Sequence, residues 1–545
     1  MHTWKLFTFS LLIVVILTAG CTTALPPATP IVPTTVPMAT QVPTRDMQTL
    51  PVEKQVLTVN EAAAPLAVSG STVPCCSSGG TSNVNDEPYD LTFFQNYGTN
   101  PFIDTEDDTL STVAMDVDTA SYTVLRRFLS DGFLPDPDGV LVEEVLNYFD
   151  MNYPDPERGD FGIYLEGAPS PFGGEKYWLV KVGLQARRLA AEERKDAILT
   201  FVVDVSGSMD LENRLGLVKR GLRLLVNELR PTDQVALVVY GSTAHTILNP
   251  TSAAEPEVIL DAIDRLQPEG ATNAEAGLQL AYQMAARAFD PDSINRVILC
   301  SDGVANVGNT GPDSILRTIE DYAARDIYLS TIGFGMGNFN DVLMEQLADK
   351  GNGNYAYVDT LDEARRVFVQ NLTGMLQVIA RDAKVQVEFD PAVVSRYRLL
   401  GYENRDIADE QFRDDTVDAG EVGAGHSVTA LYEVKFHDEA AGDALTVRIR
   451  YADPETDEVT EQSRALGRED FRSTFDDASS HFQLAATAAE FAEILRNSYW
   501  AKESSLEQVA DLARQISDRL EEDPDVREFA ALAATAARLW ANTQD

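Results

Sequence analysis

The sequence predicts an α/β fold: a doubly wound, mostly parallel sheet with a flanking β-sandwich and a C-terminal helical unit. Between residues 195 and 372, apolar strands alternate with amphipathic helices, the pattern of parallel strands joined by helical crossovers. On both sides of this segment, short stretches alternate apolar and polar residues, which is typical of antiparallel strands. From residue 476 onward, helical periodicity and alanine dominate.

The composition supports a packed core and excludes several classes of function. The chain has 545 residues, 44% of them hydrophobic, and a formal charge of −43 from 43 Lys and Arg against 86 Asp and Glu. Such acidity disfavours nucleic acid as a partner, because phosphate backbones attract clusters of Lys and Arg. The 4 Cys are too few for a disulfide scaffold, and the 5 His are not paired at zinc-ligand spacing.

Residues 1–20 have the pattern of a secretory signal. Lys5 precedes an apolar run over residues 6–17, and small residues follow up to Cys21. The run is short for a membrane span, which needs ~20 apolar residues. The Ala19-Gly20-Cys21 sequence resembles the lipobox of bacterial lipoproteins. That resemblance implies a lipid on Cys21 and an extracytoplasmic protein anchored to the cell membrane or the outer membrane.

Residues 21–98 are expected to form a disordered stalk. This stretch is rich in Pro, Thr and Ser, and such sequence favours extended conformations over a packed core. Cys75 and Cys76 lie in it as an exposed pair, with no further metal ligands nearby.

Residues 99–190 are expected to fold as an N-terminal domain. The predicted elements are a strand at 111–117, helices at 119–129 and 140–149, and strands at 161–166 and 177–184. Asp116, Asp118 and Ser121 suggest a metal loop, but Asp118 and Ala120 stand where hydroxyl ligands would be needed. We interpret Asp118 or Thr119 as the cap of the following helix.

The central segment, residues 195–372, carries the alternation of strands and helices. The predicted strands are 197–205, 234–240, 296–300, 327–334 and 354–358. The predicted helices are 215–229, 257–266, 274–288, 314–324, 341–348 and 361–372. In sheets of this kind, ligands bind beyond the carboxyl ends of the strands.

Oxygen donors gather at that edge of the predicted sheet. They come from three segments separated in the chain and are Asp204, Ser206, Ser208, Thr272 and Asp302. Such a hard, oxygen-only donor set favours Mg²⁺, with Mn²⁺ or Ca²⁺ as alternatives, over zinc or copper. The competing interpretation is that the serines and the threonine are helix caps.

The same segment contains no catalytic residues that we can identify. The glycines at 333–338 do not match a nucleotide-binding loop, and no G-x-S-x-G elbow or neighbouring histidine accompanies Ser206 or Ser208. We therefore predict that the protein is not an enzyme.

Two regions follow the central segment. Residues 380–470 are expected to form a β-rich domain, which can join the strands at 161–184 in one sandwich. The acidic loop at 401–425 is either a Ca²⁺ site or, as charge runs usually are, a solvated loop. Residues 476–545 are expected to form helices at 482–496, 506–520 and 526–540, with Pro524 between the last two.

The central segment resembles the von Willebrand factor type A (vWA) domain. The metal-ion-dependent adhesion site (MIDAS) of that domain consists of the motif D-x-S-x-S, a downstream Thr and a downstream Asp. Asp204, Ser206 and Ser208 match the motif here. Thr272 and Asp302 match the two downstream residues. The resemblance implies a bound divalent cation whose last ligand is a carboxylate of a protein partner. The whole chain resembles bacterial vWA lipoproteins with an N-terminal vWA-associated domain and a C-terminal domain of unassigned role.

Two functions follow from this sequence. The first is a membrane-anchored, extracytoplasmic adhesion protein that binds a protein ligand through the cation. The alternative is a structural or assembly factor of the cell envelope in which the metal only stabilises the fold.

Overall fold

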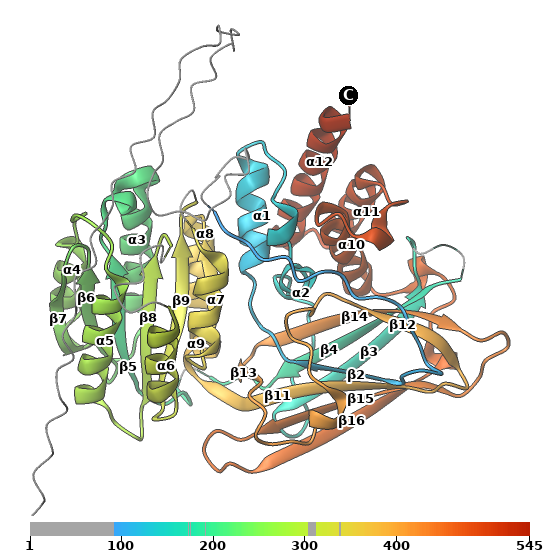
Figure 1. The fold of residues 1–545 in the computed structure, drawn as a ribbon, viewed down its shortest axis with the longest axis horizontal. Coiled ribbons are helices and arrows are strands. Elements are labelled where there is room, and N and C mark those ends of the chain that lie inside the picture. The colour runs from blue at the N-terminus through green and yellow to red at the C-terminus, as the bar shows by residue number, and fades with distance from the viewer. Residues whose placement is uncertain are drawn as a thin grey trace, which may run out of the picture. The chain divides into compact units, whose positions relative to one another are not determined.

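Three β-sheets organise the part of the chain that the structure describes (Figure 1). This structure is a computed structural model and describes residues 92–172, 174, 176–190, 192–303, 312–336 and 339–544. The predicted signal, Cys21 and the stalk up to residue 91 lie outside these residues. Contacts begin before the predicted boundary at residue 98, because the Phe93 N–H donates to the Phe339 carbonyl at 2.9 Å.

The central sheet has the strand order β10-β9-β8-β5-β6-β7. The strands are β5 (Ala197–Asp204), β6 (Gln234–Tyr240), β7 (Ala244–Ser252), β8 (Ile294–Ser301), β9 (Ile327–Phe334) and β10 (Tyr355–Val358). All pair in parallel except β7, which is antiparallel to β6. Every residue of β5 is buried, as its continuous apolar sequence requires in a sheet covered on both faces.

Helices cover both faces of this sheet, which confirms the predicted α/β fold class (Figure 1). They are α3 (Arg214–Glu228), α4 (Pro256–Asp264), α5 (Ala274–Ala288), α6 (Pro312–Ala323), α7 (Asp341–Asp349) and α8 (Leu361–Arg365). Helices α3, α4 and α8 share one core with the sheet. Helices α5, α6 and α7 share the other, and α1 (Ala120–Ser130), from before the sheet in the sequence, also contributes to it.

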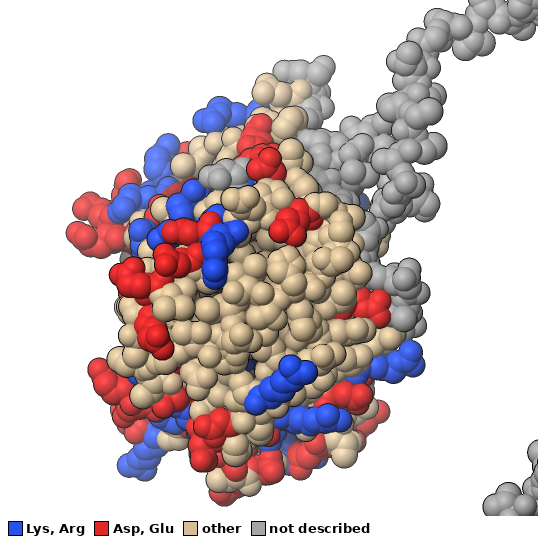
Figure 2. Space-filling model, turned by 90° about the vertical axis from the view of Figure 1, so that its left-hand side faces the viewer, with Lys and Arg blue, Asp and Glu red and all other residues tan. Residues whose placement is uncertain are grey.

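One strand and one helix of the α/β segment differ from the sequence prediction. Strand β7 was not predicted, because its sequence is polar and contains Pro250, which edge strands tolerate. It carries no Lys, Arg, Asp or Glu, and the face of the molecule on that side is largely uncharged in its middle (Figure 2). The single helix predicted at 361–372 is instead α8, a π-helical turn (Arg366–Gln370) and α9 (Leu372–Leu376).

The other two sheets pack on a common core as a sandwich. One has the order β1-β12-β14-β4-β3, and the other contains β13-β11-β15-β16 with β2 paired to β11. Strand β4 pairs with β14, so strands from before and after the α/β segment share one sheet. The strands are β1 (Ile103–Asp104), β2 (Leu110–Ala114), β3 (Phe161–Pro169), β4 (Trp178–Ala186), β11 (Val378–Phe389), β12 (Val394–Leu400), β13 (Gly420–Gly423), β14 (Ser427–Phe436), β15 (Asp443–Ala452) and β16 (Val459–Gly467).

The last helices are α10 (Ser480–Leu495), α11 (Leu506–Arg519) and α12 (Pro524–Gln544). They share an apolar core with α2 (Val142–Asn147). Arg126 of α1 also lies within 3.0 Å of carboxylate oxygens of Asp359, Glu363 and, on α12, Glu528. No helix among the described residues combines the length and the apolarity that crossing a membrane requires.

Arg405 is the centre of a buried ionic cluster. Its guanidinium lies 3.0–3.6 Å from carboxylate oxygens of four residues, Asp116, Asp118, Glu345 and Asp349. Arg405 follows β12, the first two carboxylates precede α1, and the last two belong to α7. The cluster therefore joins the N-terminal segment, the α/β segment and the sandwich.

This cluster corrects the interpretation of Asp118 and Thr119 as a helix cap. Thr119 occupies the N-cap position of α1 without a side-chain hydrogen bond to the helix. The Asp118 carboxylate accepts instead from the Tyr355 N–H at 2.9 Å, and the Ser121 N–H donates to Glu144 at 2.7 Å. Arg405 is the counterion that Asp116 and Asp118 share.

Buried carboxyl groups give the protein a pH-dependent stability. Burial raises the pKa of Glu143 to about 7 and that of Glu345 to about 8, from a usual 4.5. The folded state therefore keeps protons that the unfolded state releases, and the free energy of unfolding falls as pH rises through this range. We expect the two groups together to cost on the order of 5 kcal/mol between pH 5 and pH 8, measured by urea denaturation. Glu143→Gln cannot ionise and is expected to flatten that slope; an equal slope in the variant would contradict the assignment.

Candidate metal centre

The loop after β5 presents the first group of predicted ligands. Asp204 ends the strand and is fully buried. Its Oδ1 accepts from the Ser206 N–H at 2.7 Å, which folds the loop back over the strand end. The hydroxyl oxygens of Ser206 and Ser208 lie 3.0 Å apart, and Ser208 is only half-buried. The donors therefore run from the buried end of the strand towards the surface.

The end of β8 brings a second carboxylate beside the first. Strands β5 and β8 are neighbours, and the Ser301 hydroxyl donates to Asp204 Oδ2 at 3.0 Å. Asp302 follows directly and is buried. Burial, and then the charge of Asp302, raises the pKa of Asp204 to about 6. The two buried carboxylates therefore repel each other, and a cation nearby would relieve that repulsion.

Backbone hydrogen bonds hold the third segment against the first loop. The Gly207 N–H donates to the Gly270 carbonyl at 3.0 Å, and the Glu269 N–H donates to the Val205 carbonyl. Gly270 has a φ of +62°, a conformation that favours glycine. Thr272, half-buried, lies two residues further along.

The interpretation of these hydroxyl groups as helix caps is not supported. Asn273, not Thr272, caps α5, and its side chain accepts from the Ala276 N–H at 3.2 Å. Ser206 precedes the short 3₁₀ helix Gly207–Asn213 and makes no side-chain cap bond. The hydroxyl groups of Ser206 and Thr272 are thus not used for capping.

The donor chemistry of this site fits a hard divalent cation. Asp204, Ser206, Ser208 and Asp302 offer only oxygen atoms, and the loop of Thr272 is held against them. Hydroxyl and carboxylate oxygens are the ligands that Mg²⁺, Mn²⁺ and Ca²⁺ accept. Sequence reasoning missed two contacts of the site. Ser301 adjoins the motif, and Arg214 forms an ion pair with Asp302 at 2.7 Å.

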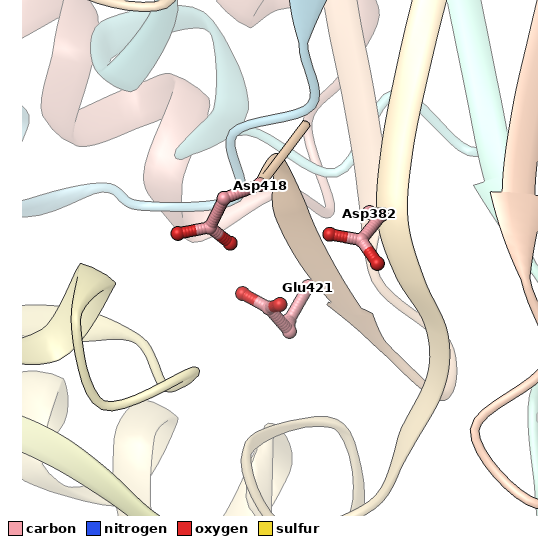
Figure 3. Close-up of side chains that lie close together, drawn as sticks. All are labelled: Asp382, Asp418 and Glu421. Atoms are coloured by element: carbon pink, nitrogen blue, oxygen red, sulfur yellow. The ribbon is translucent and has the colours of Figure 1, made fainter. Parts of the chain in front are cut away.

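A second acidic group lies in the sandwich (Figure 3). Asp382, Asp418 and Glu421 each place a carboxylate oxygen within 4.8 Å of the others. Asp382 comes from a bulged part of β11 and has a φ of +51°, so the strand pattern does not predict its position. Lys350 lies 3.7 Å from Asp418, and burial raises the pKa of Glu421 well above its usual range. Lys350 thus offsets part of the charge of this group, and burial disfavours the ionised form of Glu421.

The acidic residues of the loop at 401–425 lie in three different environments. Glu403 forms a buried pair with Arg496 at 2.7 Å, whereas Asp414 and Asp415 are exposed. Asp418 belongs to the acidic group just described.

Three family models match different parts of the chain. A model described as von Willebrand factor matches residues 89–181, and one described as von Willebrand factor type A domain matches residues 199–304. A third, described as Uncharacterized protein YfbK, C-terminal, matches residues 374–539. The resemblance inferred from the motif is therefore confirmed for the central segment, and each flank matches a family model of its own.

Two proteins and one solved structure are similar to parts of this chain. The protein YfbK of Escherichia coli is 36% identical over 456 residues, 79% of this chain and 78% of that protein. The protein sll0103 of Synechocystis is 26% identical over 283 residues, 50% of this chain and 66% of that one. A solved structure titled von Willebrand factor type A from Catenulispora acidiphila aligns with a TM-score of 0.41 at 16% identity, covering 68% of this chain and 89% of that chain.

Proposed function

Because the chain belongs to the YfbK family of proteins with a von Willebrand factor type A domain, we propose that it binds a protein ligand through a divalent cation. Asp204, Ser206, Ser208, Thr272 and Asp302 would hold the ion, with Mg²⁺ favoured over Mn²⁺ and Ca²⁺. The ligand would supply a carboxylate. The protein would be extracytoplasmic and held to a membrane by a lipid on Cys21, as the pattern of residues 1–21 suggests.

One observation carries the cation-binding proposal. Separate loops converge on Asp204, and the hydroxyl groups of Ser206 and Ser208 lie beside it without a role as helix caps. When bound, a divalent cation supplies an electrophilic position for an anionic oxygen atom. The residues of the chain position the ion and set its exposure. The buried carboxylates fix the position of the charge, and Ser208 opens the site to the surface.

The proposal predicts partner capture that depends on the metal and on one hydroxyl group. Wild-type protein immobilised with Mg²⁺ should retain a partner from an envelope extract and release it to a chelator. Ser208→Ala removes one metal donor and should weaken capture by about tenfold or more at limiting Mg²⁺. The amounts retained are measured by quantitative mass spectrometry.

A serine far from the candidate site provides the control. Ser463→Ala, the same change at an exposed position of β16, should capture as wild type does. Capture that survives chelation and the Ser208 substitution would exclude the cation from partner binding. If the metal then still stabilised the fold, the role would be that of a structural factor of the envelope.

A further inference from the structure

Arg214 is a buried cation at the edge of the candidate metal centre. It is the first residue of α3, and its side chain is 6% exposed. One guanidinium nitrogen lies 2.7 Å from Asp302 Oδ2, and another donates to the Met336 carbonyl in the loop after β9. The guanidinium is thus fixed at two points and takes one of the two carboxylate oxygens of Asp302.

The loop after β9 has a glycine because the arginine passes over it. Gly335 has a φ of +81°, and a Cβ atom added there would lie 2.2 Å from Nε of Arg214. No side chain larger than hydrogen fits that contact. The glycines at 333–338 do not match a nucleotide-binding loop. For one of them, Gly335, the close approach of Arg214 supplies a reason.

Arg214 changes the charge balance of the site. Asp204 and Asp302 contribute −2, the hydroxyl donors contribute nothing, and Arg214 contributes +1, which leaves −1. A divalent cation brings the total to +1, whereas without Arg214 the loaded site would be neutral. An anionic ligand is attracted to a net positive site, most strongly where burial lowers the local dielectric constant.

We propose that Arg214 is a positioning residue that holds one oxygen of Asp302 and keeps the metal-loaded site net positive, so that the site selects carboxylate ligands. This inference rests on the proposed function, since it assumes that the five donors hold a cation. It adds a residue outside the D-x-S-x-S motif that would set what the bound cation accepts.

The proposal requires two effects of opposite sign from one substitution. Arg214→Gln removes the charge that repels the cation and frees the second oxygen of Asp302, so the affinity for the metal should rise. The same change makes the loaded site neutral, so the affinity for a carboxylate should fall. We expect about a tenfold change in each direction. A residue that merely supported the loop would weaken both affinities when replaced.

Mn²⁺ and acetate serve as the probes on the full chain. Electron paramagnetic resonance of free Mn²⁺ gives the affinity for the metal. Acetate is then titrated at saturating Mn²⁺, and binding is followed by the fall in the water-proton relaxation rate. Arg220→Gln is the control, because it removes one positive charge from an exposed position of the same helix and should change neither affinity.

Two further variants keep the test independent of how well Arg214→Gln folds. Arg214→Lys retains the charge and should retain most of the acetate affinity. Gly335→Ala should displace the guanidinium from Asp302 and shift both affinities in the same directions as Arg214→Gln, by less. Wild-type protein that fails to bind Mn²⁺ would overturn the proposed function. Wild-type protein that binds both probes, with variants that lose both affinities or keep both, would overturn only the role of Arg214.

Discussion

Arg405→Met is expected to lower the free energy of unfolding by about 3–5 kcal/mol, because it leaves buried carboxylates without their counterion. Four carboxylates surround the guanidinium, and three of them, those of Asp116, Asp118 and Glu345, are at most 5% exposed. Methionine fills a similar volume but offers no charge and no donor. The loss therefore reflects unpaired buried charge and not a cavity.

The pH dependence of this loss identifies its cause. Burial already raises the pKa of Glu345 to about 8 and that of Asp118 well above its usual range, although Arg405 lowers both. Without the arginine these carboxyl groups take up protons more readily, so the penalty is smaller at pH 6 than at pH 8. Urea denaturation at the two pH values measures both the loss and its slope.

A surface arginine provides the comparison for this substitution. Arg413 pairs with Glu461 at 2.7 Å, and its side chain is 62% exposed. Arg413→Met should cost about 0–1 kcal/mol with little pH dependence, as exposed ion pairs do. If Arg405→Met lowered the free energy of unfolding no more than this, or independently of pH, the cluster would not stabilise the packing of the three segments.

The predictable part of the fold follows from local periodicity. Strand β5 is apolar throughout and every residue is buried, so its place in a covered parallel sheet can be read from the sequence. Strand β7 has no such signal, because an edge strand with Pro250 is specified by its pairing with β6. The break after Arg365 is likewise absent from the apolar pattern, since the π-helical turn continues the same buried face with Val367 and Phe368.

The candidate site divides in the same way. The D-x-S-x-S motif follows a strand, and strand order alone predicts that its loop and Asp302 meet at one edge of the sheet. Arg214 is 88 residues from Asp302, and Arg405 is 289 residues from Asp116. Ion pairs over such separations leave no periodic trace and depend on how helices and loops pack. Asp382 depends on a bulge that turns its side chain towards Asp418 and Glu421.

Asp204→Asn is expected to lower the affinity for Mg²⁺ by about 100-fold or more, because it removes one of the two carboxylates of the donor set. The amide keeps an oxygen that can accept from the Ser206 N–H, and the Ser301 hydroxyl can rotate to accept from the amide nitrogen. The loop should therefore keep its conformation. Isothermal titration with Mg²⁺ measures the loss, and Asp321→Asn, at an exposed position of α6, is the matched control.

The same substitution should stabilise the metal-free protein, because of the charge repulsion in the site. Asp204 is fully buried, and burial and Asp302 raise its pKa to about 6, so at pH 8 the folded state holds an ionised carboxylate at a cost. Removing that charge should raise the free energy of unfolding without metal by on the order of 1–2 kcal/mol. Saturating Mg²⁺, at about 100 times its dissociation constant, should stabilise the wild type by about 2.7 kcal/mol and the variant hardly at all. A variant that keeps its response to Mg²⁺ would place the cation elsewhere, whereas one that loses this response but still binds the partner would make the cation purely structural.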